Sequence, residues 1–174
     1  MTNFKTIDYL QQGNQRQQQA YKALKDLNIF ENLKAYNPIL TGTIPIDIDI
    51  PTSDLDIICC CDNHAAFQQA LRRLFADKQN FKLKEKAHAG IKSTIARFDT
   101  TDFEIEIFGQ QLPTEQQHAY RHMLIEHAIL RARGLEFKQQ IRALKLAGLK
   151  TEPAFAKLLG LEGNPYEALL TWNQ

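Results

Sequence analysis

The short apolar run at residues 55–61, interrupted only by Asp56, most constrains the fold of this 174-residue chain. Its shortness predicts a strand, and its apolar side chains predict that the strand is buried. The run ends in three consecutive cysteines, Cys59, Cys60 and Cys61. Neighbouring residues on a strand point to opposite faces, and zinc sites use spaced ligand pairs. We therefore interpret the cysteines as small apolar residues of a buried strand in a reducing compartment.

Other strand-like runs lie on both sides of this one, and Gly90 marks a turn between two of them. Residues 46–50, between Pro45 and Pro51, fit either a short edge strand or an extended loop. The expected strands occupy residues 38–43, 55–61, 81–88, 93–98 and 103–108.

Helical spacing of apolar residues predicts one helix at residues 7–27, with its glutamines on the solvated face, and another at 64–76. A third is expected at 114–133, where Thr114 and Gln117 form a capping box and Gly134 ends the helix. The remaining helices are expected at 137–147 and in two short segments that begin near Thr151 and Asn164.

This order of elements predicts the α+β class, with a mixed sheet flanked by helices and a C-terminal helical tail. We expect a single domain over residues 1–174, with the sheet core at about 38–110 and the tail at about 114–174. The hydrophobic content of 44% suits a globular domain. The net charge of +1 gives no global attraction to nucleic acid, which we do not expect as a partner. No signal or membrane-spanning segment is evident, so we expect a cytoplasmic protein.

Two short segments carry the residue types of a phosphate and metal site. Gly42 follows a predicted strand and allows close approach of a ligand, and the Thr43 hydroxyl can hold a phosphate oxygen. Asp54 and Asp56 are two residues apart at the start of the next strand, so they share a face with Cα atoms about 6.6 Å apart. Two such carboxylates repel each other unless a cation lies between them, and Mg²⁺ prefers this setting.

A second acidic pair, Glu104 and Glu106, shares one face of the last predicted strand. If that strand lies beside the strand of Asp54 and Asp56, one glutamate completes a cluster of three carboxylates. Such clusters hold two metal ions for in-line phosphoryl or nucleotidyl transfer. We prefer Glu106 as the third carboxylate and keep Glu104 as the alternative.

The pattern Gly42-Thr43, Ser53-Asp54-Leu55-Asp56 and Glu106 between two isoleucines resembles the nucleotidyltransferase superfamily. Most of the chain also resembles a bacterial branch of it, a domain of unknown function. The usual Gly-Ser is Gly-Thr here, which keeps the hydroxyl. The resemblance implies an NTP substrate, Mg²⁺ or Mn²⁺, and an unknown small-molecule or protein acceptor. It also leaves open a non-catalytic relative that binds a nucleotide or a partner protein.

The resemblance assigns roles residue by residue. It makes Asp54, Asp56 and Glu106 the catalytic metal ligands, with Glu106 as a ligand or a base. The residues expected to bind the nucleotide are Gly42, Thr43, Ser53, Gln110 and Arg121.

Other polar groups have competing explanations. Asp47 and Asp49 fit a rival metal pair or the outer face of an exposed strand. His118, His122 and Glu126 are spaced for one helix face, but they lack the glutamate of a metalloprotease helix. Four residues alternate on one face of a predicted strand and fit either a nucleic-acid track or a solvated edge: Lys82, Lys84, Lys86 and His88.

Overall fold

The computed structural model describes residues 2–88 and 90–172. The strands of this part are β1 (Ile39–Thr41), β2 (Leu55–Cys60), β3 (Gln79–His88), β4 (Ile91–Asp99) and β5 (Glu104–Gln110). They form one five-stranded sheet in the order β1-β2-β5-β4-β3. Only β2 and β5 run parallel among the described strands, since the other neighbouring pairs are antiparallel. The expected mixed sheet is therefore confirmed.

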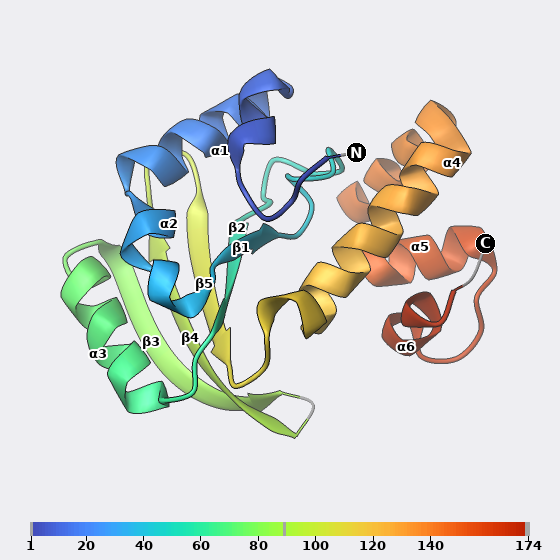
Figure 1. The fold of residues 1–174 in the computed structure, drawn as a ribbon. Helices are drawn as coiled ribbons and strands as arrows, with labels where there is room; N and C mark the ends of the chain where they lie inside the picture. The colour runs from blue at the N-terminus through green and yellow to red at the C-terminus, as the bar shows by residue number, and fades with distance from the viewer. Residues whose placement is uncertain (1, 89, 173–174) are drawn as a thin grey trace.

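Helices cover the sheet in two groups (Figure 1). The first group lies on one face and contains α1 (Gln15–Asp26), α2 (Ile29–Asn32) and α3 (His64–Phe75). The second group comes from the C-terminal part and contains α4 (His118–Leu146), α5 (Thr151–Leu159) and α6 (Pro165–Leu170). Short 3₁₀ turns join these elements: η1 (Asp8–Gln12), η2 (Lys34–Tyr36) and η3 (Thr114–Gln116). The helices flank the sheet as the α+β class requires. Within the described residues, none combines the length and apolarity needed to cross a membrane.

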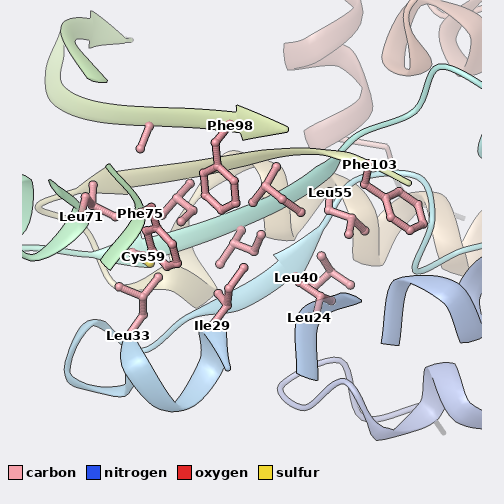
Figure 2. Packing of buried hydrophobic residues seen from close by; sticks show 14 of the residues in the cluster. Leu24, Ile29, Leu33, Leu40, Leu55, Cys59, Leu71, Phe75, Phe98 and Phe103 are labelled. Carbon is pink, nitrogen blue, oxygen red and sulfur yellow. The ribbon is translucent and has the colours of Figure 1, made fainter. Parts of the chain in front are cut away.

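The first core lies between the sheet and α1–α3 (Figure 2). Helix α3 begins after Asn63, whose side chain accepts a hydrogen bond from the Ala66 amide, and it places Phe67 and Phe75 against the sheet. The Phe75 ring stacks on Phe98 of β4, with centroids 4.9 Å apart. A side chain at Gly109 of β5 would collide with Phe67, so the missing side chain lets α3 approach the sheet. This packing fixes the strands that carry the acidic residues.

The second core lies on the other face, where Ile39 and Ile58 of the sheet pack with α4, α5 and α6. Gly134 has φ +78° and breaks the helical geometry inside α4, which therefore consists of two segments. The expected break at Gly134 is confirmed. Two buried phenylalanines, Phe137 and Phe155, join the second segment to α5. The bend and this contact hold α5 against α4.

The N-terminal region differs from the single helix expected at residues 7–27. The chain forms η1, breaks at Gly13, and begins α1 after Asn14. Asn14 and Gln17 form the capping box: the Asn14 side chain accepts from the Gln17 amide at 2.9 Å, and the Gln17 side chain accepts from the Asn14 amide at 3.0 Å. Gln17 is buried and donates to the carbonyls of Ile44 and Pro45, so this glutamine does not lie on a solvated face.

The expected capping box at Thr114 and Gln117 is also wrong. Thr114 begins the short turn η3, and α4 begins only after Gln117, which makes no capping hydrogen bond. The buried Gln117 amide instead donates to the carbonyls of Cys59 and Leu112. The side-chain oxygen of Gln117, the atom that would accept a capping hydrogen bond, is buried and has no partner among the described residues.

A candidate active site between the sheet and the C-terminal helices

A cleft of about 540 Å³ lies between one face of the sheet and the helices α4 and α5. The wall from the sheet and its loops includes Gly42, Thr43, Ser53, Asp54, Asp56 and Glu106. The helical wall includes His118, His122, Glu126, Lys145, Lys150 and Glu152. Two walls built from distant parts of the chain therefore enclose the cleft.

The acidic residues of the sheet wall lie in one row across the strands. Asp56 of β2 is the ladder partner of Glu106 of β5, and Glu106 is the partner of Arg97 of β4. Paired residues of neighbouring strands share a face, so the side chains of Asp56 and Glu106 are adjacent. Asp54 lies two residues before Asp56 and lines the same cleft. The structure thus brings the three predicted carboxylates to one wall, while their roles stay predictions.

The setting of Asp56 is electrostatically unfavourable for a carboxylate. Burial raises the pKa of Asp56 well above its ordinary value, and the charges of Asp54 and Glu106 raise the pKa further, while Arg97 opposes the shift. A divalent cation against the two aspartates would relieve this repulsion. The aspartates therefore fit such an ion by their charge.

Gly42 makes room for this carboxylate. Its φ of +84° lies in the left-handed region, and a side chain there would place its Cβ 2.6 Å from Asp56 Oδ2. The expected close approach at Gly42 is therefore made by Asp56, a residue of the chain itself. The position of the Asp56 carboxylate depends on the missing side chain.

Arg97 is the main feature of this wall that the sequence did not indicate. Its guanidinium is ion-paired and hydrogen-bonded with the Glu106 carboxylate, and its Nη1 lies 3.7 Å from Glu104 Oε1. Glu104 is exposed and does not line the cleft. Among the described residues, no group of three or more His, Cys, Asp or Glu side chains is arranged to hold a metal ion. The charge of the Glu106 carboxylate is thus balanced by Arg97. Of the three carboxylates, only those of the two aspartates fit a cation without breaking an ion pair.

The predicted nucleotide-binding residues are placed unequally. The Thr43 hydroxyl donates to Ser53 Oγ at 3.2 Å, and Ser53 Oγ accepts from the Ile50 amide at 3.0 Å. This bridge holds both hydroxyls at the cleft. Gln110 also lines the cleft, but its buried amide donates to Ser93 Oγ at 3.0 Å. Arg121 is exposed and does not line the cleft, because α4 turns His118 and His122 toward it instead.

The loop before Ser53 is a turn, so the loop interpretation of residues 46–50 holds and the exposed-strand interpretation of its aspartates is wrong. Asp47 accepts a hydrogen bond from Asn14 Nδ2 at 2.6 Å and is ion-paired with Lys138. Asp49 is buried, and its Oδ1 has no hydrogen-bond partner in the described structure. Neither aspartate lines the cleft, so the structure gives no support to a rival metal pair there.

Basic residues of α4 hold this loop from the other side. Arg142 Nε donates to the Asp49 carbonyl at 3.1 Å, and Lys145 Nζ donates to the Ile48 carbonyl at 2.8 Å. With Lys138 they form a helical series on one side of α4. That spacing was the signal in the sequence, but the irregular loop it contacts gave no matching pattern.

The helical wall contains an unusual pair of buried ionisable groups. Burial, with the charge of Glu152, raises the pKa of Glu126 to about 8, and Glu126 Oε1 has no hydrogen-bond partner in the described residues. Burial lowers the pKa of Lys145 to about 8. His122 Nε2 donates to the Tyr166 carbonyl at 2.8 Å, and His122 Nδ1 lies 3.6 Å from Glu152 Oε1. These contacts account for His122 without a metal ion.

A family model described as a domain of unknown function, DUF4269, matches residues 22–172. No curated protein matches the sequence. The fold resembles that of Cid1 poly(U) polymerase bound to MgGTP, with a TM-score of 0.55 and 15% identity over 76% of this chain and 42% of that chain. A variant of the same polymerase bound to MgATP gives a TM-score of 0.56 and 16% identity over 90% of this chain and 49% of that chain.

A cytoplasmic RNA terminal U-transferase gives a TM-score of 0.50 and 19% identity over 74% of this chain and 38% of that chain. The chain therefore spans half or less of the length of these solved structures. At such identities the likeness shows the fold alone, which is the nucleotidyltransferase fold. The names of these proteins describe a poly(U) polymerase and an RNA terminal U-transferase. The expectation that nucleic acid is not a partner therefore has no support from them.

Proposed function

This chain belongs to the family of the domain of unknown function DUF4269, and we propose that its cleft transfers a nucleoside monophosphate from an NTP to an acceptor. The observation that carries the proposal is the row of Asp56 and Glu106 on adjacent parallel strands, with Asp54 on the same cleft wall. The Cid1 structures of the same fold hold MgGTP or MgATP, which supports an NTP with Mg²⁺ or Mn²⁺.

Each residue of the sheet wall has a part in this proposal. Asp54 and Asp56 would hold the divalent cation, which would offset the negative charge of the phosphates. Glu106 has one of two roles. It either joins the metal ligands, or its carboxylate separates from Arg97 and accepts the proton of the acceptor hydroxyl. The acceptor oxygen bonds to the α-phosphorus, the bond from that phosphorus to the β-phosphate oxygen breaks, and pyrophosphate leaves.

The loops of the cleft position the phosphates. The Ser53 oxygen accepts from the Thr43 hydroxyl and from the Ile50 amide, so the Ser53 O–H remains to donate to a phosphate oxygen. Lys145 faces these groups from the helical wall, and its charge interacts with that of Asp54. Lys145 and the Ser53 hydroxyl would thus offer a positive charge and a hydrogen-bond donor to the triphosphate.

A thermal-shift experiment tests the proposal. NTPs of all four bases are added with and without Mg²⁺ or Mn²⁺ to the wild type, to Asp54→Asn, and to Asp26→Asn, a matched control at an exposed position of α1. An NTP with metal at a hundred times its dissociation constant stabilises by about 2.7 kcal/mol, which raises the melting temperature by about 5–10 °C. We expect this rise in the wild type and the control, and its loss in Asp54→Asn. No shift with any NTP and metal would remove the proposal.

The ion pair of Arg97 with Glu106 favours a second candidate, a non-catalytic relative that binds a nucleotide. In that case the nucleotide shifts the melting temperature with little dependence on metal. Release of pyrophosphate from the NTP, measured in the presence of candidate acceptors, then separates the two. Binding that needs metal, together with pyrophosphate release abolished by Asp54→Asn, supports the enzyme.

A further inference from the structure

We propose that the acceptor is a single-stranded nucleic acid, held by Lys82, Lys84 and Lys86 along β3 with its reacting end at the Asp56–Glu106 row. This inference rests on the proposed function for the chemistry at that end. The binding surface itself is argued from β3, β4 and β5, and it is tested separately.

The three lysines form one exposed charged row. They alternate along β3, so they share one face at a spacing of about 6.6–6.8 Å. All three side chains are exposed, and in the described part of the chain none forms an ion pair. Glu85, on the opposite face of the same strand, is paired with Lys92 at 3.0 Å. The positive charge of this strand therefore lies uncompensated on one side.

The register shows that this side is the side of the carboxylates. Lys82 is the ladder partner of Arg97, which is the partner of Glu106, which is the partner of Asp56. Two strand spacings separate Lys82 from Glu106, so their backbones are about 10 Å apart. A chain bound along β3 therefore has its end within reach of the proposed reacting site.

At Lys84 the surface between the lysine row and the cleft is apolar. Lys84 pairs with Ile95, and Ile95 pairs with Phe108 of β5, which also lines the cleft. Ile95 and Phe108 are half-buried. Proteins bind single-stranded nucleic acids with a basic groove that follows the phosphates and with side chains that stack on the bases. Each base stacked on an aromatic ring contributes about 1–3 kcal/mol of binding free energy. The lysines can therefore contact the phosphates of a single strand while the apolar strip beside them contacts its bases.

The net charge of +1 does not oppose this binding, because phosphate contacts depend on the local surface. Figure 1 shows β3 at the outer edge of the sheet, away from the group α4–α6. An exposed edge strand also uses lysines to prevent pairing with other chains. That explanation predicts that neutral substitutions promote association of the protein and leave nucleic-acid binding unchanged.

The test measures fluorescence anisotropy of a labelled single strand of about 12 nucleotides, a length within the range of single-strand sites. All proteins carry Asp54→Asn, so that turnover does not alter the probe. Lys84→Gln/Lys86→Gln is compared with Lys22→Gln/Lys25→Gln, which removes the same charge from exposed positions on α1. We expect about tenfold weaker binding for the β3 pair and less than about twofold for the α1 pair.

The salt dependence gives a second readout. Loss of two phosphate contacts should make the slope of log affinity against log salt shallower by about 1.4, since each contact to a single strand contributes about 0.7. Equal effects of the two double variants, or no binding by the parent protein, would overturn the proposal. These measurements do not involve turnover. A failure of nucleic-acid binding can therefore be distinguished from a failure of the NTP and metal experiments.

Discussion

At the scale of single residues, the missing side chain of Gly42 determines where the Asp56 carboxylate can lie. The backbone of Gly42 occupies the left-handed region, and the space of its missing side chain is filled by the Asp56 carboxylate. Gly160 also has a positive φ, of +67°, but nothing lies within 4 Å of the Cβ that a substitution there would add. Substitutions at the two glycines therefore distinguish the effect of backbone strain, present at both, from displacement of the Asp56 carboxylate, which occurs only at Gly42.

We predict that Gly42→Ala and Gly160→Ala each lose about 1–2 kcal/mol of unfolding free energy through backbone strain, and that only Gly42→Ala weakens binding of Mg²⁺ or Mn²⁺. Gly42→Ala should lose more stability than the control because Asp56 must also move. Urea unfolding and titration calorimetry measure the two effects. Unchanged metal affinity in Gly42→Ala would show that the Asp56 carboxylate is not a ligand.

At the scale of elements, α4 brings buried ionisable groups to the cleft. The pKa of Glu126 rises from 4.5 to about 8, so the native state binds more protons than the unfolded state in that window, and stability falls as the pH rises. The pKa of Lys145 falls from 10.5 to about 8, so the native state binds fewer protons between those values, and stability rises with pH. This pair of groups therefore favours a stability minimum near pH 8.

We predict that Glu126→Gln removes the part of the stability loss between about pH 4.5 and 8 that comes from Glu126. The variant should gain on the wild type progressively across this range, since it has no carboxyl to ionise in the buried site. Urea unfolding at several pH values gives the difference. Glu136→Gln, at an exposed position on the same helix, should run parallel to the wild type. If Glu126→Gln also runs parallel, the Glu126 carboxyl titrates normally.

The elements differ in how far their sequence predicts them. Strand β2, helix α3 and the break at Gly134 follow from local patterns of apolar residues and glycine, and all were predicted. The register of Asp56 beside Glu106 depends on pairing between distant strands, so it could be predicted only on the condition that those strands lie side by side. Arg97 at Glu106 follows from that register and not from any local motif. The exposed-strand interpretation of Asp49 was wrong because the contacts of this loop come from α4, far along the chain.

At the scale of the whole molecule, the two cores lie on opposite faces of one sheet. Trp172 is the single tryptophan of the chain, and it packs against the second core. Its fluorescence therefore reports on the C-terminal helices, whereas far-ultraviolet circular dichroism reports on all helices and strands. The two signals together test whether residues 1–174 behave as a single domain.

We predict that both signals give the same urea transition, because a single cooperative unit unfolds at once. Phe155→Ala in the second core and Phe75→Ala in the first should each lower both transitions together, by about 3–5 kcal/mol. The two variants are matched controls for each other, since both remove a fully buried phenylalanine. If Phe155→Ala moves only the Trp172 signal, the helical tail is a separate unit.

The central parallel pair also has a consequence for the order in which this chain acquires its activity. β2 and β5 are neighbours in the sheet, yet α3, β3 and β4 lie between them in the sequence. Such a pairing is slow to form, since a long stretch of chain must fold back first. A nascent chain that stops before Glu104 therefore has the aspartates without their neighbour. An ion that binds only the finished row stabilises the native protein and none of its folding intermediates.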